Sequence, residues 1–140
     1  MRYRRRHYRY AVVAAAERPR SAIDWWQVTG TIVVTPGAWR PRTDVYETAE
    51  RVLVTVELPG VEPDDLDVQL FEDALLVEGR RPVPETASNG LYHSAEIPRG
   101  RFRLSLVLPA VIDPDRGDAR FDRGLLELAL PKAGEASDGH

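Results

Sequence analysis

The fold is decided near the carboxyl end of the chain, at residues Ala119–Lys132, which read ARFDRGLLELALPK. An alternating apolar run forms its second half, with Leu126, Leu128 and Leu130 at every second position. Such alternation predicts a strand with one buried face. We expect Gly124 to supply a positive φ in a turn before this strand, and Pro131 to end it, since proline has no N–H to donate.

The same alternation recurs upstream, from residue 51 onward. The apolar positions are Val52, Val54, Val56 and Leu58; Leu66, Val68 and Leu70; Leu75 and Val77; and Phe102, Leu104, Leu106 and Leu108. Turn signals separate these runs, at Pro59-Gly60, Glu72-Asp73, Asn89-Gly90 and Asp113-Pro114. Several short strands with regular breaks and no long helical repeat predict an all-β fold, an immunoglobulin-like antiparallel β-sandwich.

Length and composition suit one domain of about 100 residues with flanking segments. Pro36, Gly37 and Pro41 interrupt regular structure and indicate a domain boundary at these residues. The sequence therefore predicts an irregular, flexible N-terminal arm (1–41), the sandwich (42–132) and a short disordered tail (133–140). The chain has no cysteine, which excludes disulfides and thiolate chemistry. We see neither a leader of the secretory kind nor a membrane-spanning run, and therefore expect a cytoplasmic protein.

Charge is distributed unevenly along the chain. Residues 1–42 hold nine arginines against two acidic residues, whereas residues 43–140 hold ten basic residues against twenty acidic ones. The two parts should attract each other, within a chain or between chains, and salt should weaken that attraction.

Four motifs follow one another in a specific order: VELPGVEPDDLDVQL, ALLVEGRR, GRFRLSLVLP and ARFDRGLLELALPK. In this set the chain resembles the α-crystallin domain of the small heat-shock proteins, over about residues 42–132. The family signature of Ala, three variable residues, a turn residue, Gly, an aliphatic and Leu is matched by Ala119, Arg123, Gly124, Leu125 and Leu126. We expect these residues to shape the fold rather than to touch a client.

The resemblance implies an ATP-independent holdase, which binds partly unfolded proteins and prevents their aggregation under stress. Apolar residues outside the sandwich pattern are the predicted client contacts: Ile23, Trp25, Trp26 and Val28. The alternative is that these tryptophans are buried in an interface between subunits.

Family dimers of the bacterial type exchange a strand carried on a long loop. The matching segment lies between residues 81 and 102, and the candidate strand is Leu91, Tyr92, His93, Ser94, Ala95 and Glu96. We therefore predict a strand-exchanged homodimer and a higher oligomer; the alternative is a mobile hairpin loop. An Arg that contributes to charge pairing near the family's dimer interface is replaced by Leu104, which puts that ion-pair network in doubt.

Many family members join dimers through an isoleucine-x-isoleucine tail that docks in a groove, and the tail KAGEASDGH lacks such a pair. The matching groove would involve Val68, Leu70 and Phe121. Ile32 and Val34 have the same spacing and could enter two adjacent pockets as the linker between dimers. The alternative is that this segment adds a strand to its own sandwich.

No residue pattern indicates catalysis, a cofactor or a metal. His93 and Ser94 are adjacent, so on a strand they would face opposite ways. Asp64-Asp65 and Asp113-Pro114-Asp115 read as ordinary turns, and no glycine loop for phosphate is present. We therefore expect a protein that is not an enzyme.

The basic start of the chain, MRYRRRHYRY, interleaves arginine with tyrosine. That combination suits a nucleic-acid-binding module, which is the alternative function. We favour docking of this arm on the acidic domain, in the same or a neighbouring subunit, and regard nucleic acid as an unlikely partner. A co-chaperone adaptor on a related sandwich is a third possibility, which the exchange segment and the Ala119–Leu126 signature disfavour.

Overall fold

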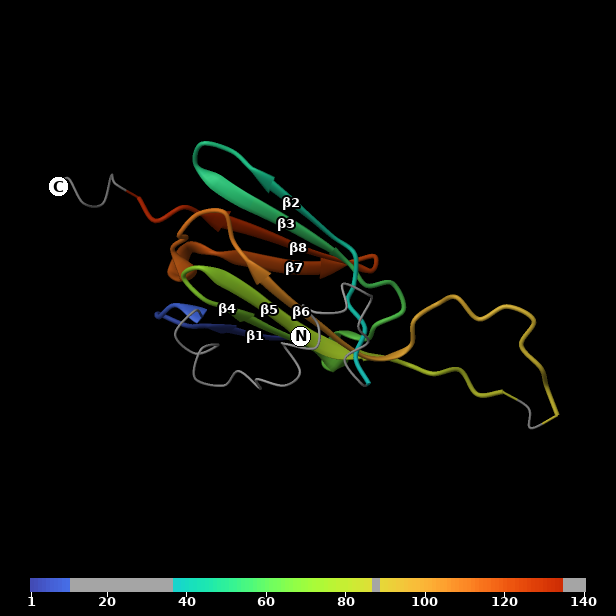
Figure 1. The fold of residues 1–140 in the computed structure, drawn as a ribbon. Helices are drawn as coiled ribbons and strands as arrows, with labels where there is room; N and C mark the ends of the chain where they lie inside the picture. The colour runs from blue at the N-terminus through green and yellow to red at the C-terminus, as the bar shows by residue number, and fades with distance from the viewer. Residues whose placement is uncertain (11–36, 87–88, 135–140) are drawn as a thin grey trace, which may run out of the picture.

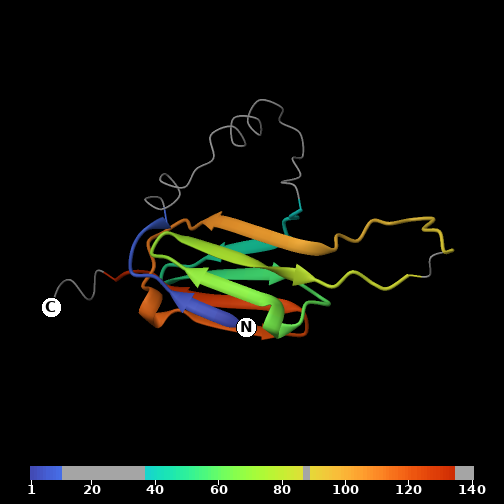
Figure 2. The ribbon, with the colours of Figure 1, turned by 90° about the horizontal axis from the view of Figure 1, so that it is seen from below.

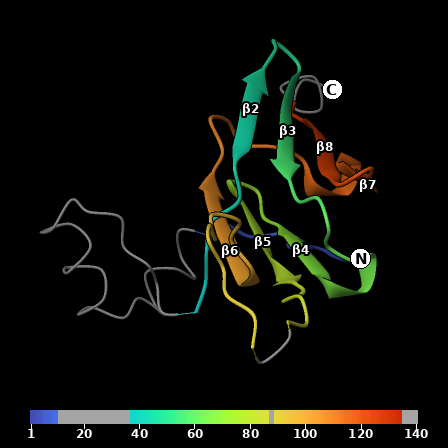
Figure 3. The same ribbon diagram turned by 90° about the vertical axis from the view of Figure 1, so that its right-hand side faces the viewer.

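Two four-stranded sheets face each other in the computed structural model, which describes residues 1–10, 37–86 and 89–134 (Figures 1 and 3). The first sheet has the order β1 (Arg2–Arg5), β4 (Leu66–Leu70), β5 (Ala74–Arg81) and β6 (Gly100–Val107). The second has the order β2 (Thr43–Glu47), β3 (Arg51–Glu57), β8 (Leu125–Pro131) and β7 (Asp118–Asp122). Two short 3-10 helices, η1 (Pro63–Asp65) and η2 (Pro114–Arg116), precede β4 and β7. The predicted β-sandwich is confirmed.

The core lies between the sheets and consists of the alternating apolar residues. Its fully or almost fully buried side chains include Val52, Val54, Val56, Leu58, Leu66, Val68, Leu70, Leu75, Val77, Phe102, Leu104, Leu126, Leu128 and Leu130. Burial of one such side chain contributes about 1.5–3 kcal/mol, so this set supplies the main stabilisation of the sandwich.

A two-residue turn at Arg123-Gly124 joins β7 to β8. Both residues have positive φ, 54° and 82°, and Asp122 pairs with Leu125 across the hairpin. These angles match the turn type whose twist fits an antiparallel hairpin. The predicted positive φ of Gly124 is confirmed, and the strand does end at Pro131.

A strand forms where the apolar pattern gave no signal, at residues 2–5. It pairs in parallel with β4, and Tyr3 is the Cα partner of Val68 (Figure 2). By contrast, the predicted exchange segment forms no strand in the single chain. Among the described residues, none belongs to a helix of the length and apolarity needed to cross a membrane.

Candidate functional site

Residues 2–10, which we call the N-terminal strap, follow the outer edge of β4. Four successive residues pair with β4, from Arg2 opposite Asp67 to Arg5 opposite Leu70. The Arg6 amide then donates to the Leu70 carbonyl over 2.7 Å, and the Glu72 amide donates to the Tyr8 carbonyl over 3.2 Å. The edge of β4 is therefore occupied by the chain's own first residues.

Tyr3 is the strap residue that points into the sandwich. It packs against the core, and Arg5 lies over its ring at 4.7 Å. A Cβ on Gly117 would lie 2.7 Å from Leu70 Cδ2, 3.1 Å from Tyr3 Oη and 3.2 Å from Leu130 Cδ2. These three side chains thus converge on Gly117, which leaves the room that the tyrosine fills. Burial raises the pKa of the Tyr3 hydroxyl.

The outward side of the strap carries basic groups that meet acidic and amide groups of the domain. Arg4 makes two hydrogen bonds to the Asp67 carboxylate, at 2.9 and 3.1 Å. Arg6 donates to Gln69 Oε1, and His7 Nε2 lies 2.6 Å from Asp115 Oδ1. A longer ion pair joins Arg9 to Glu72 at 3.9 Å. The described start of the arm therefore docks on acidic surface, as the charge distribution predicts.

The far end of the strap covers a second apolar cluster, formed by Phe71, Ala74 and Leu76. The rings of Tyr8 and Tyr10 lie 5.6 and 4.9 Å from that of Phe71. The Tyr10 amide donates to Asp73 Oδ1 over 2.6 Å. This contact explains why Leu76 is buried although it points away from the main core.

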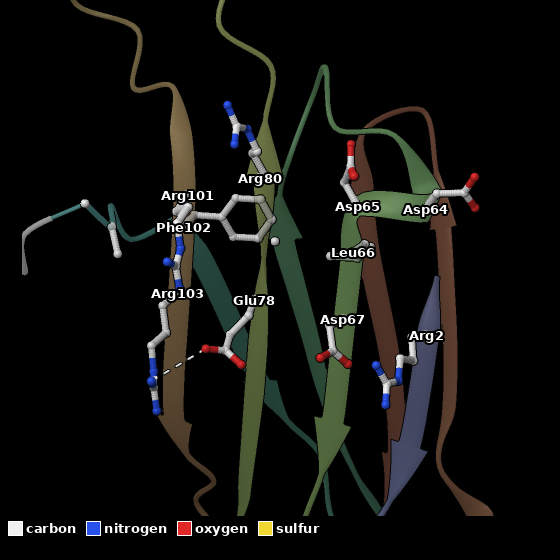
Figure 4. Close-up of a pocket in the computed structure, with 13 residues that line it drawn as sticks. Arg2, Asp64, Asp65, Leu66, Asp67, Glu78, Arg80, Arg101, Phe102 and Arg103 are labelled. Atoms are coloured by element: carbon white, nitrogen blue, oxygen red, sulfur yellow. Dashed lines mark ion pairs between the residues drawn. The ribbon is translucent and has the colours of Figure 1, made fainter.

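An open hollow of about 590 Å³ lies on the outer face of the first sheet (Figure 4). Charged residues of both signs line it: Arg2, Asp64, Asp65, Asp67, Glu78, Arg80, Arg101 and Arg103. Arg103 pairs with Glu78 at 3.5 Å. Among the described residues, no group of three or more His, Asp or Glu side chains is placed to hold a metal ion.

Arg81 is the buried charged residue at the base of the loop between β5 and β6. Its guanidinium donates to the carbonyl of Pro98, at 2.7 and 3.0 Å, and to that of Pro59 at 3.1 Å. It also stacks on Trp39 at 4.4 Å, and burial lowers its pKa. Arg81 thereby fixes both ends of the loop. The period-two pattern of β5 indicates that the side chain of Arg81 points inward, because Arg81 follows Leu75, Val77 and Gly79 at every second position.

Beyond that base, the described residues of the loop, 82–86 and 89–99, extend away from the sandwich (Figures 1 and 2). Leu91 is 81% exposed and Tyr92 60%. The strand β2 lies at an edge of the second sheet, where Val45 and Tyr46 are also exposed. The free side of β6 is bridged near its start by Trp39, whose amide donates to Arg101 and whose carbonyl accepts from Arg103.

The predicted site residues fall into three groups: those buried in the sandwich, those exposed in the β5–β6 loop, and those outside the described residues. Val68 and Leu70 are fully buried on β4, whose edge the strap occupies, and Phe121 is partly buried on β7 against the core. Leu91–Glu96 are exposed in the loop. The predicted client contacts Ile23, Trp25, Trp26 and Val28, and the predicted linker residues Ile32 and Val34, lie outside the described residues.

The family signature has a structural role in the β7–β8 hairpin. Ala119 packs against the core, and Leu126 is fully buried. Leu125 is 38% exposed. The amide of Leu58 donates to the Gly124 carbonyl over 2.7 Å, and a Cβ on Gly124 would lie 2.7 Å from Pro59 Cα. Leu104, which replaces the family Arg, is buried, while Arg103 on the opposite face pairs with Glu78.

Tyr3 is the functional residue that the sequence analysis missed. Its signal was the alternation of Arg2, Tyr3 and Arg4, in which one aromatic residue lies between two arginines. An edge strand with a single inward side chain gives that pattern, but a run with so few apolar residues is indistinguishable from an irregular basic arm.

Comparisons with known proteins agree with this architecture. Residues 44–140 match the family model described as the Hsp20/alpha crystallin family. Small heat shock protein C2 of Rickettsia felis is 37% identical over 92 residues, 66% of this chain, and the chain spans 60% of that relative's length.

Solved structures agree as well. Heat shock protein 16.0 from Schizosaccharomyces pombe superimposes with a TM-score of 0.60 at 35% identity, over 69% of this chain and 89% of that one. A small heat-shock protein from Xylella fastidiosa gives a TM-score of 0.59 at 28% identity, over 69% of this chain and 88% of that one. The chain therefore belongs to the Hsp20/alpha crystallin family.

Proposed function

We propose that this protein is an ATP-independent holdase chaperone of the cytoplasm, which binds partly unfolded proteins and keeps them from aggregating. The match of residues 44–140 to the Hsp20/alpha crystallin family, together with the similarity to heat shock proteins of Rickettsia felis and Schizosaccharomyces pombe, is the observation that carries the proposal. Chains that unfold expose apolar patches and unpaired strand edges, so a protein that captures them needs surfaces complementary to both.

The described residues offer surfaces of this kind. The β2 edge can accept an extended segment by strand addition, and the exposed apolar side chains of the β5–β6 loop can pack against apolar patches. The arm residues Ile23, Trp25, Trp26 and Val28 add apolar side chains that the sandwich pattern does not use. Binding of this kind forms and breaks no covalent bond.

We further propose that two copies form a homodimer in which Leu91–Glu96 of each loop pairs with β2 of the other copy. A segment that forms no strand in its own chain and an edge strand with exposed Val45 and Tyr46 are suitable partners. The added pairing would satisfy backbone groups on both sides.

The primary test compares the full chain with residues 41–140. We expect the full chain to suppress aggregation of a heated client protein without ATP, and the truncated chain to lose most of that suppression. Binding of RNA at increasing salt is measured on the same two proteins. Strong RNA binding by the full chain at physiological salt, with no suppression of aggregation, would instead establish the nucleic-acid function.

A double variant separates the client contacts from the strap. Trp25→Ser with Trp26→Ser leaves residues 2–10 intact and should reduce suppression several-fold. The matched control is Val107→Ser, which removes an apolar side chain that is 77% exposed on β6. Equal suppression by the tryptophan variant and the control would refute the assignment of these residues.

The nucleic-acid alternative has a specific difficulty in the docked strap. Base stacking requires accessible aromatic faces, and Tyr3 is packed against the core while Tyr10 lies on Phe71. Two of the three strap tyrosines would have to undock before they could stack on bases.

A further inference from the structure

We propose that the N-terminal strap is an exchangeable strand: residues 2–10 of one copy pair with β4 of a second copy and thereby join the copies into a larger assembly. The partner is the chain itself, and the binding surface is the β4 edge with the Tyr3 site and the Phe71 cluster. This inference concerns assembly, and it holds or fails independently of client capture.

The first support is the specificity of the docked contacts. The strap has a defined register against β4, and Arg4 makes a two-pronged contact with Asp67, whose geometry adds specificity. Tyr3 fills a site beside Gly117, where a Cβ would lie 3.1 Å from the tyrosine hydroxyl. A segment with both a backbone register and a shaped anchor is a ligand for this edge, wherever it comes from.

The second support is what the strap covers. Without it, β4 would present a row of unpaired backbone groups beside the apolar side chains around Gly117, together with Phe71, Ala74 and Leu76. An uncovered edge of this kind pairs with another chain. The edge therefore needs an occupant at all times, and every copy carries one.

The third support is the length of the connection between the strap and the domain. Gly37 and Arg2 line the same hollow, beside Arg80 near the end of β5, whereas the amide of Tyr10 donates to Asp73, just before β5 begins. The length of β5 separates these ends, roughly 26 Å for an eight-residue strand. Residues 11–36 can span up to roughly 90 Å when fully extended. The connection is therefore several times longer than docking within one chain requires.

Exchange between copies would preserve every contact, because the strap and the edge are identical in all copies. Swapping an identical element is a low-cost route to assembly, and the balance is set by concentration and by the length of the connection. The tail carries no aliphatic pair that could make this contact instead.

The test uses the absence of native cysteine. Arg4 and Gln69 are Cα partners in the β1–β4 register, and both side chains face outward. Arg4→Cys and Gln69→Cys are made on separate chains, which are mixed under mildly oxidising conditions at physiological salt. We expect disulfide-linked pairs containing one chain of each kind. The control mixes Arg4→Cys with Glu127→Cys, which lies on the other sheet opposite Arg120.

The result that would overturn the proposal is a mixture with no more cross-linked pairs than this control, while a chain carrying both Arg4→Cys and Gln69→Cys closes its disulfide internally. The internal disulfide would show that the strap docks only on its own domain.

A second measurement uses no cysteine. Tyr3→Ser removes the anchor while leaving every fully buried side chain between the two sheets in place, and it should lower the native mass at least twofold at micromolar concentration. Arg2→Ser, at an outward position on the same strand, is the control and should leave the mass unchanged. An unchanged mass with Tyr3→Ser would contradict the exchange.

Discussion

At the scale of single residues, Gly124 shows how one backbone angle fixes the end of the fold. Its φ of 82° follows the 54° of Arg123, and its carbonyl holds the amide of Leu58. The hairpin turn and the end of β3 therefore depend on one position. Only a residue without a Cβ satisfies both, since a Cβ would lie within 3.2 Å of three Pro59 atoms.

Replacement of Gly124 by Ala tests this reading. Positive φ alone costs an alanine about 1–2 kcal/mol, and the collision with Pro59 adds to it, so we expect a loss of roughly 2–4 kcal/mol in the free energy of unfolding. Gly100→Ala is the matched control, because Gly100 also has φ of 82° but nothing lies within 4 Å of its Cβ position. Urea unfolding should show the smaller loss there. Equal losses would mean that the Pro59 contact has no effect.

At the scale of elements, the sequence predicted those whose side chains alternate. The apolar runs of β3, β4, β6 and β8 have period two because one face of each is buried, and the register follows from that burial. β5 differs, since it begins with four buried residues and Leu76 on its outer face belongs to the Phe71 cluster. β2 and β7 were harder to predict, since their burial patterns are mostly exposed or intermediate. The pattern of a half-buried strand is weak where little is buried.

The strap could not be predicted for a related reason. Backbone pairing with β4 and one inward side chain hold it, and backbone pairing leaves no trace in the identity of the residues. The opposite charges of arm and domain did predict docking, but not where. That place depends on the open space beside Gly117, which arises only when β4 and β8 are assembled.

The loop between β5 and β6 carries a prediction about the dimer. Deletion of residues 85–96 removes the proposed exchange strand and leaves Arg81 and Pro98 to hold the base. Light scattering after size separation should show the smallest stable species fall from dimer to monomer. Arg80→Ser, just outside the deleted segment, should leave the dimer intact. A shortened chain that stays dimeric would rule out exchange through this loop.

Docking of the strap should weaken as the pH rises. The hydrogen bond from His7 to Asp115, and then the charge of that carboxylate, raise the pKa of His7, with Glu72 and Asp113 adding to the effect. Protonation therefore favours the docked strap. This contribution is complete below about pH 6.5, the value for a free histidine, and is lost as the pH passes the higher docked value.

The measurement is the hydrogen-exchange protection factor of the Arg6 amide, which bonds to Leu70. Between pH 6 and pH 8.5 we expect it to fall by about two- to fivefold, as for an exposed ion pair. His7→Gln should show little such change. A protection factor independent of pH in the native chain would exclude the histidine as a contributor.

At the scale of the whole molecule, a compact acidic sandwich carries extended segments that can pair with other chains. The strap uses backbone pairing with β4, and the proposals for the exposed loop and the β2 edge invoke the same kind of pairing with other chains. Attraction between basic and acidic parts is screened over about 8 Å at physiological salt, so added salt should loosen the strap before it affects the core.

The central claim is capture of unfolding chains without turnover, and titration during heating tests it most directly. A thermally unstable client is heated without nucleotide at increasing ratios of this protein, and the client remaining in solution is measured after centrifugation. The account predicts that soluble client rises to a plateau at a fixed subunit ratio, in a joint complex, and that added ATP does not move the plateau. Client that sediments to the same extent at every ratio as it does in buffer would contradict the account.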